Sequence, residues 1–329
     1  MQHIDAIHNA IVLSNTEITN ILTNIGWPTI IDAISETFIE EAHGRVVSPA
    51  KTVISFPETN NDFRLMPSYM KLYPDFCGVK IIGACTDNPR KYNLPLAIGM
   101  YVLNDKLTQR PLMMFDAGIP TAWRTAAATA VAVRNMTAPH AEILGIIGCG
   151  VQAHYHIPAI RAVRNLTKVM VCDLDEAKMT AVIDQHWGNI VRATKQEILE
   201  QADIVVTMTP TIKPHILTSD VQNRSMLICA VGGDSEKKME FEPSILTVTD
   251  HFCDSLEQVA HTGTVHIGLR DGIIKPEDLK SLGDLMVGKQ KYDLSKPLKM
   301  FLSTGVALED LAMAILLYQV ARLDDAGWY

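Results

Sequence analysis

The chain has 329 residues, enough for one large domain or two of ordinary size, and 47% of them are hydrophobic, as in an ordinary globular protein. Its formal net charge of −8 at pH 7 argues against a protein that binds nucleic acid or an anionic membrane surface. No apolar run approaches the roughly 20 residues that span a bilayer, and the segment from Met1 to Asn15 lacks the basic stretch of a signal peptide.

The first third of the chain combines helical and strand patterns. Apolar residues repeat at helical spacing over residues 16–43, where Pro28 stands near the first position of a helical segment. Alternating or continuous apolar runs then predict strands over residues 46–56, 62–66, 79–82, 96–103 and 112–115. These segments predict an α+β unit built on a mixed sheet.

A helix rich in small residues begins at Thr121, and after it strands alternate with helices. The predicted strands are residues 143–148, 168–173, 203–208, 226–231 and 246–250. Such alternation predicts a parallel sheet with right-handed crossovers. The last predicted helix, residues 308–323, is strongly apolar, and we expect it to pack against the N-terminal part of the chain.

These elements predict an α/β protein with two domains. A Rossmann nucleotide-binding domain, residues 121–302, is expected to be inserted within a discontinuous α+β domain, residues 1–120 and 303–329. No low-complexity tract or long linker separates the two, so this division comes from the element pattern.

Cysteine and histidine usage predicts neither disulfides nor a metal site. The six cysteines are scattered, without any C-x-x-C motif, and several lie in apolar runs that read as strands. We expect small buried thiols in a reducing cytoplasm. No spacing of histidine, cysteine and aspartate resembles a zinc or iron site, so no metal is predicted.

The strongest motif is a dinucleotide fingerprint after the strand at residues 143–148. Gly148, Gly150 and Ala153 occupy the three small positions of G-x-G-x-x-A, and Asp173 ends the next strand twenty residues later. Gly148 allows a tight turn, Gly150 lets a pyrophosphate approach the backbone, and Ala153 lets the helix pack on the sheet. A carboxylate at Asp173 favours NAD over NADP, because it repels a 2′-phosphate. The alternatives are a glycine-rich structural turn and an exposed strand-end acid.

Further polar residues follow the later strands of the same predicted sheet. Thr207 and Thr209 end one strand and are expected to line the dinucleotide, unless they are strand-end threonines without a ligand. Asp234 follows Val231 and two glycines at the end of another strand, where ligands of open α/β sheets bind. Its carboxylate suits a substrate ammonium or general acid–base catalysis, and the alternative is a turn aspartate that caps its own backbone.

Three cations stand out in the first 125 residues. Arg45 follows Gly44 at a predicted helix end, Lys80 lies inside an apolar strand, and Arg124 lies at an otherwise uncharged helix start. Lysine and arginine are rarely buried without a partner, which here is a substrate carboxylate or a structural carboxylate of the chain. Composition and spacing leave both possibilities open.

Together these segments resemble the ornithine cyclodeaminase/mu-crystallin family over about residues 40–320. The resemblance rests on Arg64-Leu65-Met66-Pro67, Gly78-Val79-Lys80, 112–116, 121–128, 148–153, 202–209, 231–234, Asp254-Ser255 and 303–310. It implies NAD(P) binding, action on amino or imino acids, and a homodimer formed by the discontinuous domain, which also binds the substrate.

The resemblance also implies roles for particular residues. Arg45, Lys80 and Arg124 match the family's substrate-carboxylate cluster, Asp234 matches its catalytic acid beside the nicotinamide, and Thr125 matches a cofactor-phosphate contact. Asp234 and Lys80 are accordingly the expected catalytic residues. The expected cofactor site comprises Thr125, Gly148, Gly150, Val151, Gln152, Ala153, Asp173, Thr207, Thr209, Val231 and Gly232.

Two positions depart from the family pattern. Where ornithine cyclodeaminases carry an acid before Leu-Met-Pro, this chain has Arg64, which would repel a distal ammonium and attract a second carboxylate or a carbonyl. Leu96 stands where many members carry serine or threonine, which removes one phosphate hydrogen bond.

The resulting hypothesis is an NAD-dependent oxidoreductase acting on the C–N bond of an amino or imino acid. Two alternatives remain open. One is an ornithine cyclodeaminase, in which NAD is recycled, and the other is a cofactor-gated binding protein like mu-crystallin.

Overall fold

Each of the two sheets in the described part of the chain belongs to its own unit. The computed structural model describes residues 10–59, 61–85, 87–233 and 238–325. One unit comprises Met1–Arg124 and Val306–Tyr329, and the other comprises Thr125–Gly305. The boundary falls inside helix α2, Gly118–Met136, so Arg124 and Thr125 are neighbours on one helix but belong to different units.

The sheet of the first unit has the order β1-β7-β6-β5-β4-β2, with β3 paired to β4 as well. Its strands are β1 (Ile11–Leu13), β2 (Val46–Val47), β3 (Thr52–Phe56), β4 (Asn61–Met70), β5 (Phe76–Ala84), β6 (Ala97–Asp105) and β7 (Pro111–Asp116). β1 pairs with β7 in parallel and the other pairs are antiparallel, as expected for a mixed sheet.

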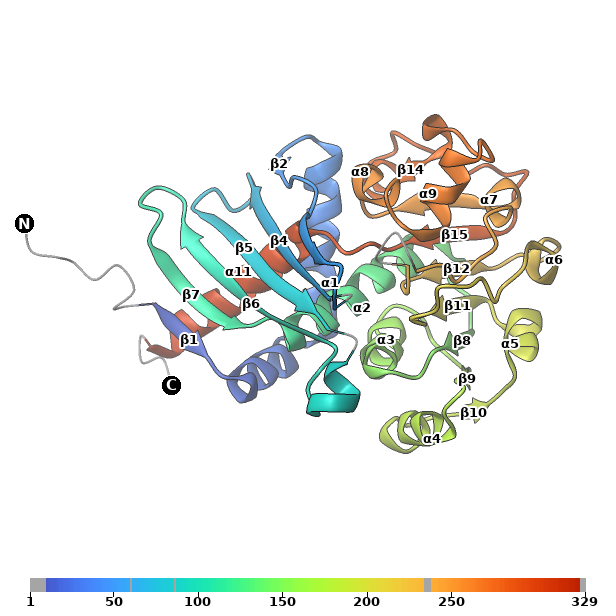
Figure 1. The fold of residues 1–329 in the computed structure, drawn as a ribbon, viewed down its shortest axis with the longest axis horizontal. Coiled ribbons are helices and arrows are strands. Elements are labelled where there is room, and N and C mark those ends of the chain that lie inside the picture. The colour runs from blue at the N-terminus through green and yellow to red at the C-terminus, as the bar shows by residue number, and fades with distance from the viewer. Residues whose placement is uncertain (1–9, 60, 86, 234–237, 326–329) are drawn as a thin grey trace, which may run out of the picture. The chain divides into compact units, whose positions relative to one another are not determined.

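Two long helices belong to this unit, α1 (Asn15–Ala42) and α11 (Ala307–Asp325). Ser14 and Glu17 form a capping box at the start of α1, and Gly26, with φ of 77°, breaks the helix just before Pro28. The apolar α11 packs against α1 and against β4, β5 and β6, as its composition predicts, and Figure 1 shows it behind the sheet.

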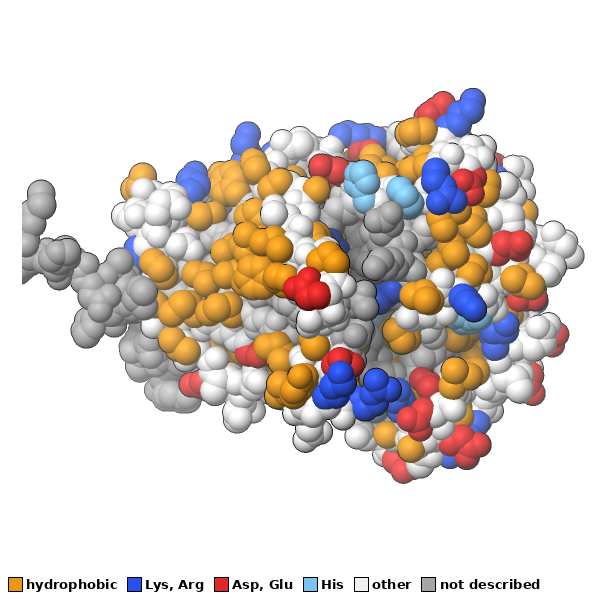
Figure 2. Space-filling model, viewed as in Figure 1, with side chains coloured by type: hydrophobic (Ala, Val, Ile, Leu, Met, Phe, Trp, Pro, Cys, Tyr) orange, Lys and Arg blue, Asp and Glu red, His pale blue; other side chains and the backbone are white. Residues whose placement is uncertain are grey.

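The sheet of this unit has one buried and one exposed apolar face. Met66, Lys80 and Tyr101 are direct neighbours across β4, β5 and β6 and are all buried. On the opposite face, five large apolar side chains of β3, β4 and β6 are exposed by 38 to 50%: Ile54, Phe56, Phe63, Ile98 and Met100. Figure 2 shows hydrophobic side chains gathered over this sheet. We call these five residues the open sheet face.

The second unit is a parallel sheet in the order β10-β9-β8-β11-β12-β15-β13-β14. Its strands are β8 (Ile143–Ile147), β9 (Lys168–Cys172), β10 (Ile190–Arg192), β11 (Ile204–Thr207), β12 (Leu227–Ala230), β13 (Asp250–Cys253), β14 (Lys280–Ser281) and β15 (Lys299–Leu302). Strand order reverses between β8 and β11, the place where a Rossmann sheet opens a crevice for its ligand.

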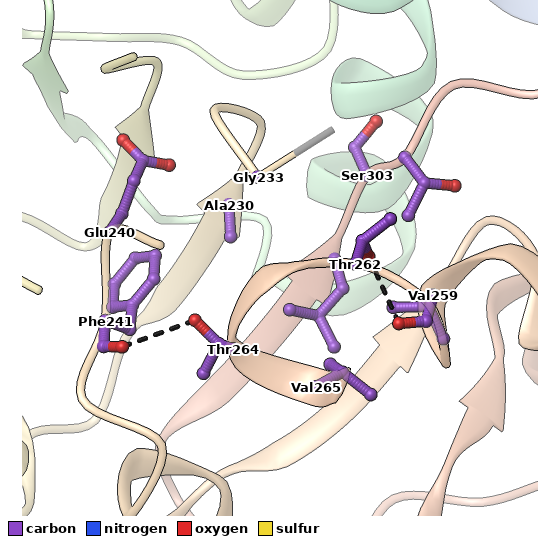
Figure 3. A pocket seen from close by; sticks show the side chains of 11 residues that line it. Ala230, Gly233, Glu240, Phe241, Val259, Thr262, Thr264, Val265 and Ser303 are labelled. Atoms are coloured by element: carbon purple, nitrogen blue, oxygen red, sulfur yellow. Dashed lines mark hydrogen bonds between the residues drawn. The ribbon is translucent and has the colours of Figure 1, made fainter. Parts of the chain in front are cut away.

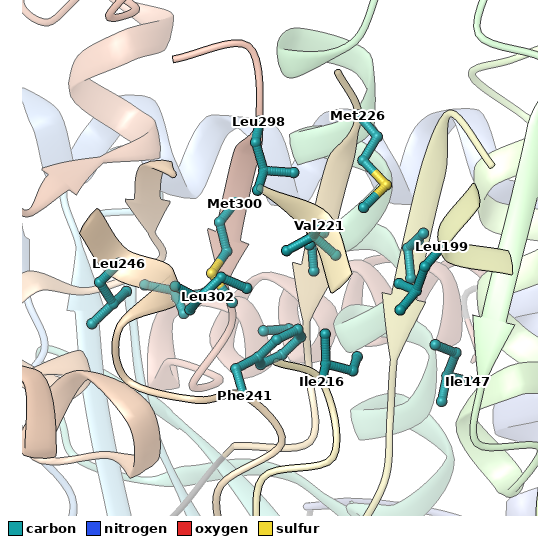
Figure 4. Close-up of a cluster of buried hydrophobic side chains, with 14 of the residues drawn as sticks. Ile147, Leu199, Ile216, Val221, Met226, Phe241, Leu246, Leu298, Met300 and Leu302 are labelled. Atoms are coloured by element: carbon teal, nitrogen blue, oxygen red, sulfur yellow. The ribbon is translucent and has the colours of Figure 1, made fainter. Parts of the chain in front are cut away.

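Helices connect these strands. They are α3 (Val151–Arg161), α4 (Glu176–Gln185), α5 (Lys195–Gln201), α6 (Thr218–Val221), α7 (Ile245–Val248), α8 (Leu256–Val259), α9 (Gly263–Arg270) and α10 (Leu282–Met286). A buried apolar cluster that includes Ile147, Leu199, Phe241 and Met300 fills the core of this unit (Figure 4). None of the described helices is both long and apolar enough to cross a bilayer.

The predicted strand over residues 246–250 is wrong. Ile245–Val248 form helix α7, whose Ile245 and Leu246 are buried in the core, and the next strand β13 begins at Asp250. A short apolar run fits a buried helix turn as well as a strand, so its composition did not distinguish them. The last parallel strand, β15, lies between β12 and β13 and was not predicted.

Candidate functional site

The turn that leaves β8 requires a glycine. Gly148 has φ of 100°, and a Cβ added there would lie 2.8 Å from the carbonyl oxygen of Met208. Its N–H donates a hydrogen bond of 2.8 Å to the carbonyl of Cys172 at the end of β9. The turn is therefore packed closely on the ends of the two neighbouring strands, and a side chain would fit neither the backbone conformation nor the space.

Helix α3 begins directly after Gly150, which caps it without a side-chain hydrogen bond. A Cβ at Gly150 would meet nothing within 4 Å, whereas Ala153 in the first turn is fully buried. The first N–H groups of α3, which include those of Val151 and Gln152, have no carbonyl partner one turn earlier in the helix. Together with the helix dipole they form a position suited to a phosphate group.

Asp173 follows β9 and contacts the glycine turn. Its Oδ2 accepts a hydrogen bond of 2.7 Å from the N–H of Cys149, and its Oδ1 accepts one of 2.9 Å from the N–H of Asp175. The carboxylate thus stabilises the turn after β8 in addition to its predicted role toward a ribose. Each carboxylate oxygen has a second lone pair, so these bonds leave room for ribose hydroxyls.

A buried glutamate that the sequence did not single out joins the loops after β11 and β12. Glu240 Oε1 accepts hydrogen bonds from Thr209 N at 2.8 Å and Thr209 Oγ1 at 2.6 Å. Its Oε2 accepts from Thr207 Oγ1 at 2.8 Å and Gly232 N at 3.0 Å. Burial raises the pKa of the Glu240 carboxyl, and the four hydrogen bonds oppose that rise. Both threonine hydroxyls predicted to line the dinucleotide therefore donate to Glu240.

The segment after β12 is also held from β11. The N–H groups of Val231 and Gly232 donate to the Thr207 carbonyl at 2.9 and 3.1 Å. A Cβ at Gly232 would lie 2.5 Å from the Glu240 carboxyl group, so this position excludes a side chain. Asp234, the predicted catalytic acid, comes two residues later and lies outside the described residues.

A small cavity of about 20 Å³ lies beside Glu240 and Gly233 (Figure 3). Thr262, Thr264 and Ser303 contribute hydroxyls to its lining, of which Thr262 donates to Val259 O and Thr264 to Phe241 O, at 3.1 and 3.3 Å. Its volume is that of roughly one water molecule, so it is too small for a nicotinamide ring.

In the first unit, Lys80 and Arg124 meet on one carboxylate. Asp310 at the start of α11 places Oδ2 at 2.6 Å from Lys80 Nζ and Oδ1 at 3.2 Å from Arg124 Nε. The neighbouring Glu309 accepts from Arg124 NH1 at 2.7 Å. All four side chains are buried, and we call them the buried ion cluster. Structural carboxylates, the alternative partners left open by the sequence, thus contact both cations.

Burial dominates the titration of Lys80. Desolvation lowers the pKa of the Lys80 ammonium to about 8, Asp310 opposes this change, and the charges of Arg124 and Lys51 add to it. Lys80 is therefore an ammonium over most of the physiological range but close enough to its pKa to lose a proton in mild alkali.

The remaining cations have their own partners. Arg45 forms an ion pair with Glu40 near the end of α1. Among the described contacts, none joins Arg45 to the buried ion cluster. Arg64 donates to both oxygens of Asp62, from Nε at 2.9 Å and from NH2 at 2.6 Å. Arg64 is opposite Ile82, and Lys80 is opposite Met66, so strand alternation puts both cations on one sheet face.

Thr125, the predicted phosphate contact, is buried in α2, where its carbonyl accepts a hydrogen bond from Thr129 Oγ1 at 3.2 Å.

The acids Glu309 and Asp310 were missed as site residues, although the sequence carries a signal for them. They are two adjacent acids at the head of an otherwise apolar helix, where burial demands partners. Glu240 has no such signal, because its partners lie 8 to 33 residues away in the chain.

Comparison with known proteins identifies relatives over nearly the whole chain. The sequence model of the ornithine cyclodeaminase/mu-crystallin family matches residues 10–324. An alanine dehydrogenase of Archaeoglobus fulgidus is 29% identical over 321 residues, which are 96% of this chain and 97% of that protein.

Two solved structures share the fold. An archaeal alanine dehydrogenase dimer with bound NAD matches with a TM-score of 0.88 and 27% identity, covering 96% of this chain and 97% of that one. The Thermococcus litoralis Delta(1)-pyrroline-2-carboxylate reductase, in complex with NADH and L-proline, matches with a TM-score of 0.89 and 25% identity, covering 96% and 98%. The chain thus shares its α/β fold, with a Rossmann-type sheet, with these two structures.

Proposed function

The chain belongs to the ornithine cyclodeaminase/mu-crystallin family, and from this premise we propose that it is an NAD-dependent oxidoreductase acting on the C–N bond of an amino or imino acid. The observation that carries the proposal is the pair of buried cations, Lys80 and Arg124, in a chain that also has a dinucleotide turn at Gly148. By its charge the first feature suits the carboxylate of a small substrate, which would share the two cations with Asp310 and Glu309, and the second suits the cofactor. The activities of the relatives, an alanine dehydrogenase and a pyrroline-carboxylate reductase, support the same reaction class.

The cofactor site of this proposal comprises the turn at Gly148 to Ala153, Thr125, Asp173, and the β11 and β12 loops. The pyrophosphate would bind the free N–H groups at the start of α3, and Asp173 would accept the ribose hydroxyls. A carboxylate at Asp173 favours NAD over NADP. When bound, the nicotinamide supplies or accepts the hydride.

The substrate site uses the chain's cations and one acid. Lys80 and Arg124 would bind the α-carboxylate and orient the reacting carbon, which accounts for part of the rate gain. Arg45 is included by its match to the family pattern, although binding requires it to leave Glu40. Asp234 would stabilise the positive charge of the iminium or ammonium nitrogen and exchange a proton with that nitrogen.

Arg64 bears on the substrate's side chain. Its charge would repel a distal ammonium, which argues against ornithine, and would attract a second carboxylate or a carbonyl if the guanidinium exchanged its bond to Asp62 for one to the substrate. We propose a substrate without a distal amine. A cytoplasmic location is proposed as well, because all six cysteines lie in the described ranges and none of them forms a disulfide there.

A screen of NADH consumption tests this function. Pyruvate with ammonia, a dicarboxylic 2-oxo acid with ammonia, and pyrroline-2-carboxylate are each supplied with NADH or NADPH. We expect turnover of at least one imino acid. NADH should be preferred over NADPH by about tenfold or more in kcat/KM, because the Asp173 carboxylate would repel the 2′-phosphate of NADPH.

Two other outcomes would contradict the proposal. Formation of proline and ammonia from ornithine with catalytic NAD would make the protein a cyclodeaminase. NADH binding without turnover of any substrate in the screen would make it a binding protein like mu-crystallin.

We further propose that the open sheet face forms a homodimer. Five exposed apolar side chains gathered on one sheet face form a patch, whereas a typical monomer exposes its apolar side chains singly. The related archaeal alanine dehydrogenase is a dimer. The occupant is therefore a second copy of this chain.

Phe63→Lys tests the dimer, because a buried ammonium in an apolar interface is strongly unfavourable. We expect the dimer dissociation constant to rise by about 30-fold or more, as for the loss of a residue worth about 2 kcal/mol. Light scattering after size exclusion measures it. Leu107→Lys is the matched control, since Leu107 is 89% exposed in the turn after β6 and off this face. A monomeric wild type, or a Phe63→Lys protein as dimeric as the control, would contradict the proposal.

A further inference from the structure

The first turn of α11 brings two adjacent acids to the buried ion cluster, and they contact different cations. Glu309 contacts Arg124, while Asp310 contacts both Arg124 and Lys80. The Ser68 hydroxyl of β4 donates to the Ala307 carbonyl at 2.9 Å, which fixes this turn on the sheet. This anchor helps to place Asp310 over the strand that carries Lys80.

We propose that Asp310 is a positioning residue of the carboxylate site: it aligns Lys80 Nζ and Arg124 Nε on one carboxylate and keeps Lys80 in its ammonium form. The proposal rests on the function proposed above, in which Lys80 and Arg124 bind the substrate's carboxylate. Asp310 itself would act through these cations and would not contact the reacting atoms.

The charges around Lys80 explain why such a residue is needed. From α2 it faces Arg124, from the segment before β3 it is near Lys51, and β4 carries Arg64 with its partner Asp62 on the same face. Tyr101 lies opposite it on β6, where burial raises the pKa of the phenol well above its ordinary value. Within this described set, Asp310 is the carboxylate that contacts the ammonium directly.

Without Asp310, burial and the neighbouring cations would favour a neutral amine at Lys80. A neutral amine attracts a substrate carboxylate far less than an ammonium does. Asp310 also lies in the first turn of α11, where the helix dipole interacts favourably with negative charge. The Asp310 carboxylate therefore acts as the counter-ion of Lys80 before the substrate binds. It also keeps Lys80 protonated, so that an ammonium is present when the substrate's carboxylate arrives.

The sign of the pH dependence follows from this arrangement. Lys80 binds a carboxylate when protonated, so kcat/KM for the imino acid should be flat below pH 8 and fall above it. Asp310 raises the pKa of Lys80, so removal of its charge should move the fall to lower pH.

The test compares Asp310→Asn with Glu309→Gln. For Asp310→Asn we expect the alkaline fall in kcat/KM to shift by about one pH unit or more, with a loss relative to the wild type that approaches about tenfold above pH 8 and is regained at lower pH. Glu309→Gln should lower kcat/KM without shifting the fall, because its partner Arg124 does not titrate in this range. NADH affinity, measured by fluorescence, should remain near the wild-type value in both. An unshifted fall in Asp310→Asn overturns the proposal.

Two further measurements distinguish an effect of Asp310 on Lys80 from a folding defect of the variant and from an error in the proposed reaction. Lys80→Arg, which cannot lose its proton in this range, should abolish the alkaline fall, and a fall that persists overturns the role of Lys80. NMR of protein with 13C-labelled lysine follows the Lys80 side chain directly, and its midpoint should be lower in Asp310→Asn than in the wild type. If the wild type reduces no imino acid but this midpoint moves, the proposed function fails while the effect of Asp310 on Lys80 is supported. An unmoved midpoint overturns the effect itself.

Discussion

Asp234→Asn is expected to lower kcat by about two to four orders of magnitude, the usual contribution of a general acid–base group. Asparagine has nearly the shape of aspartate but no charge for an iminium and no exchangeable acid proton, so the loss should fall on the chemical step. The NADH dissociation constant should change little. Steady-state kinetics and a fluorescence titration with NADH measure the two effects separately.

The control for this variant is Asp271→Asn. Asp271 is an exposed acid after α9 that pairs with Arg270, and it has no part in the proposed site. Its variant should turn over like the wild type. An Asp234→Asn protein with normal kcat would remove Asp234 from the mechanism, and a large loss of NADH affinity would instead make it a cofactor-binding residue.

Gly148→Ala should weaken NADH binding by at least tenfold and lower the melting temperature. With φ of 100° and a Cβ 2.8 Å from Met208 O, alanine is strained in the turn and must displace the loop after β11. Such backbone strain costs on the order of 1–3 kcal/mol, and its relief would disturb the N–H groups at the start of α3 that are proposed to bind the phosphate. Calorimetry and NADH titration provide both readouts.

Gly150→Ala is the matched comparison two residues away. Gly150 has φ of −76°, and a Cβ there meets no atom within 4 Å, so the melting temperature should stay within a degree or two of the wild type. NADH affinity should still fall, because the methyl group would occupy the approach of the pyrophosphate to α3. Full NADH affinity in Gly150→Ala would place the phosphate elsewhere, and an unchanged melting temperature in Gly148→Ala would contradict the strain.

Local patterns explain why the Rossmann unit was predictable. The fingerprint from Gly148 to Ala153 needs only a strand, a turn and a helix start, and all its residues lie within a few positions of one another. The strands β8, β9, β11 and β12 were predicted to within a residue or two because buried parallel strands are continuous apolar runs. The same rule failed at Ile245–Val248, where a single buried helix turn has the composition of a strand.

The sequence by itself determined the α/β class, the glycine turn after β8, the burial of the last helix and the unusual placement of Lys80 and Arg124. Each of these follows from residue types within a short window, which periodicity and burial costs constrain directly. Only the tertiary structure decided which side chains pair with one another in the site. Asp310 reaches Lys80 across 230 positions and Glu240 reaches Thr207 across 33, and no local pattern specifies such pairs because strand order and helix packing create them.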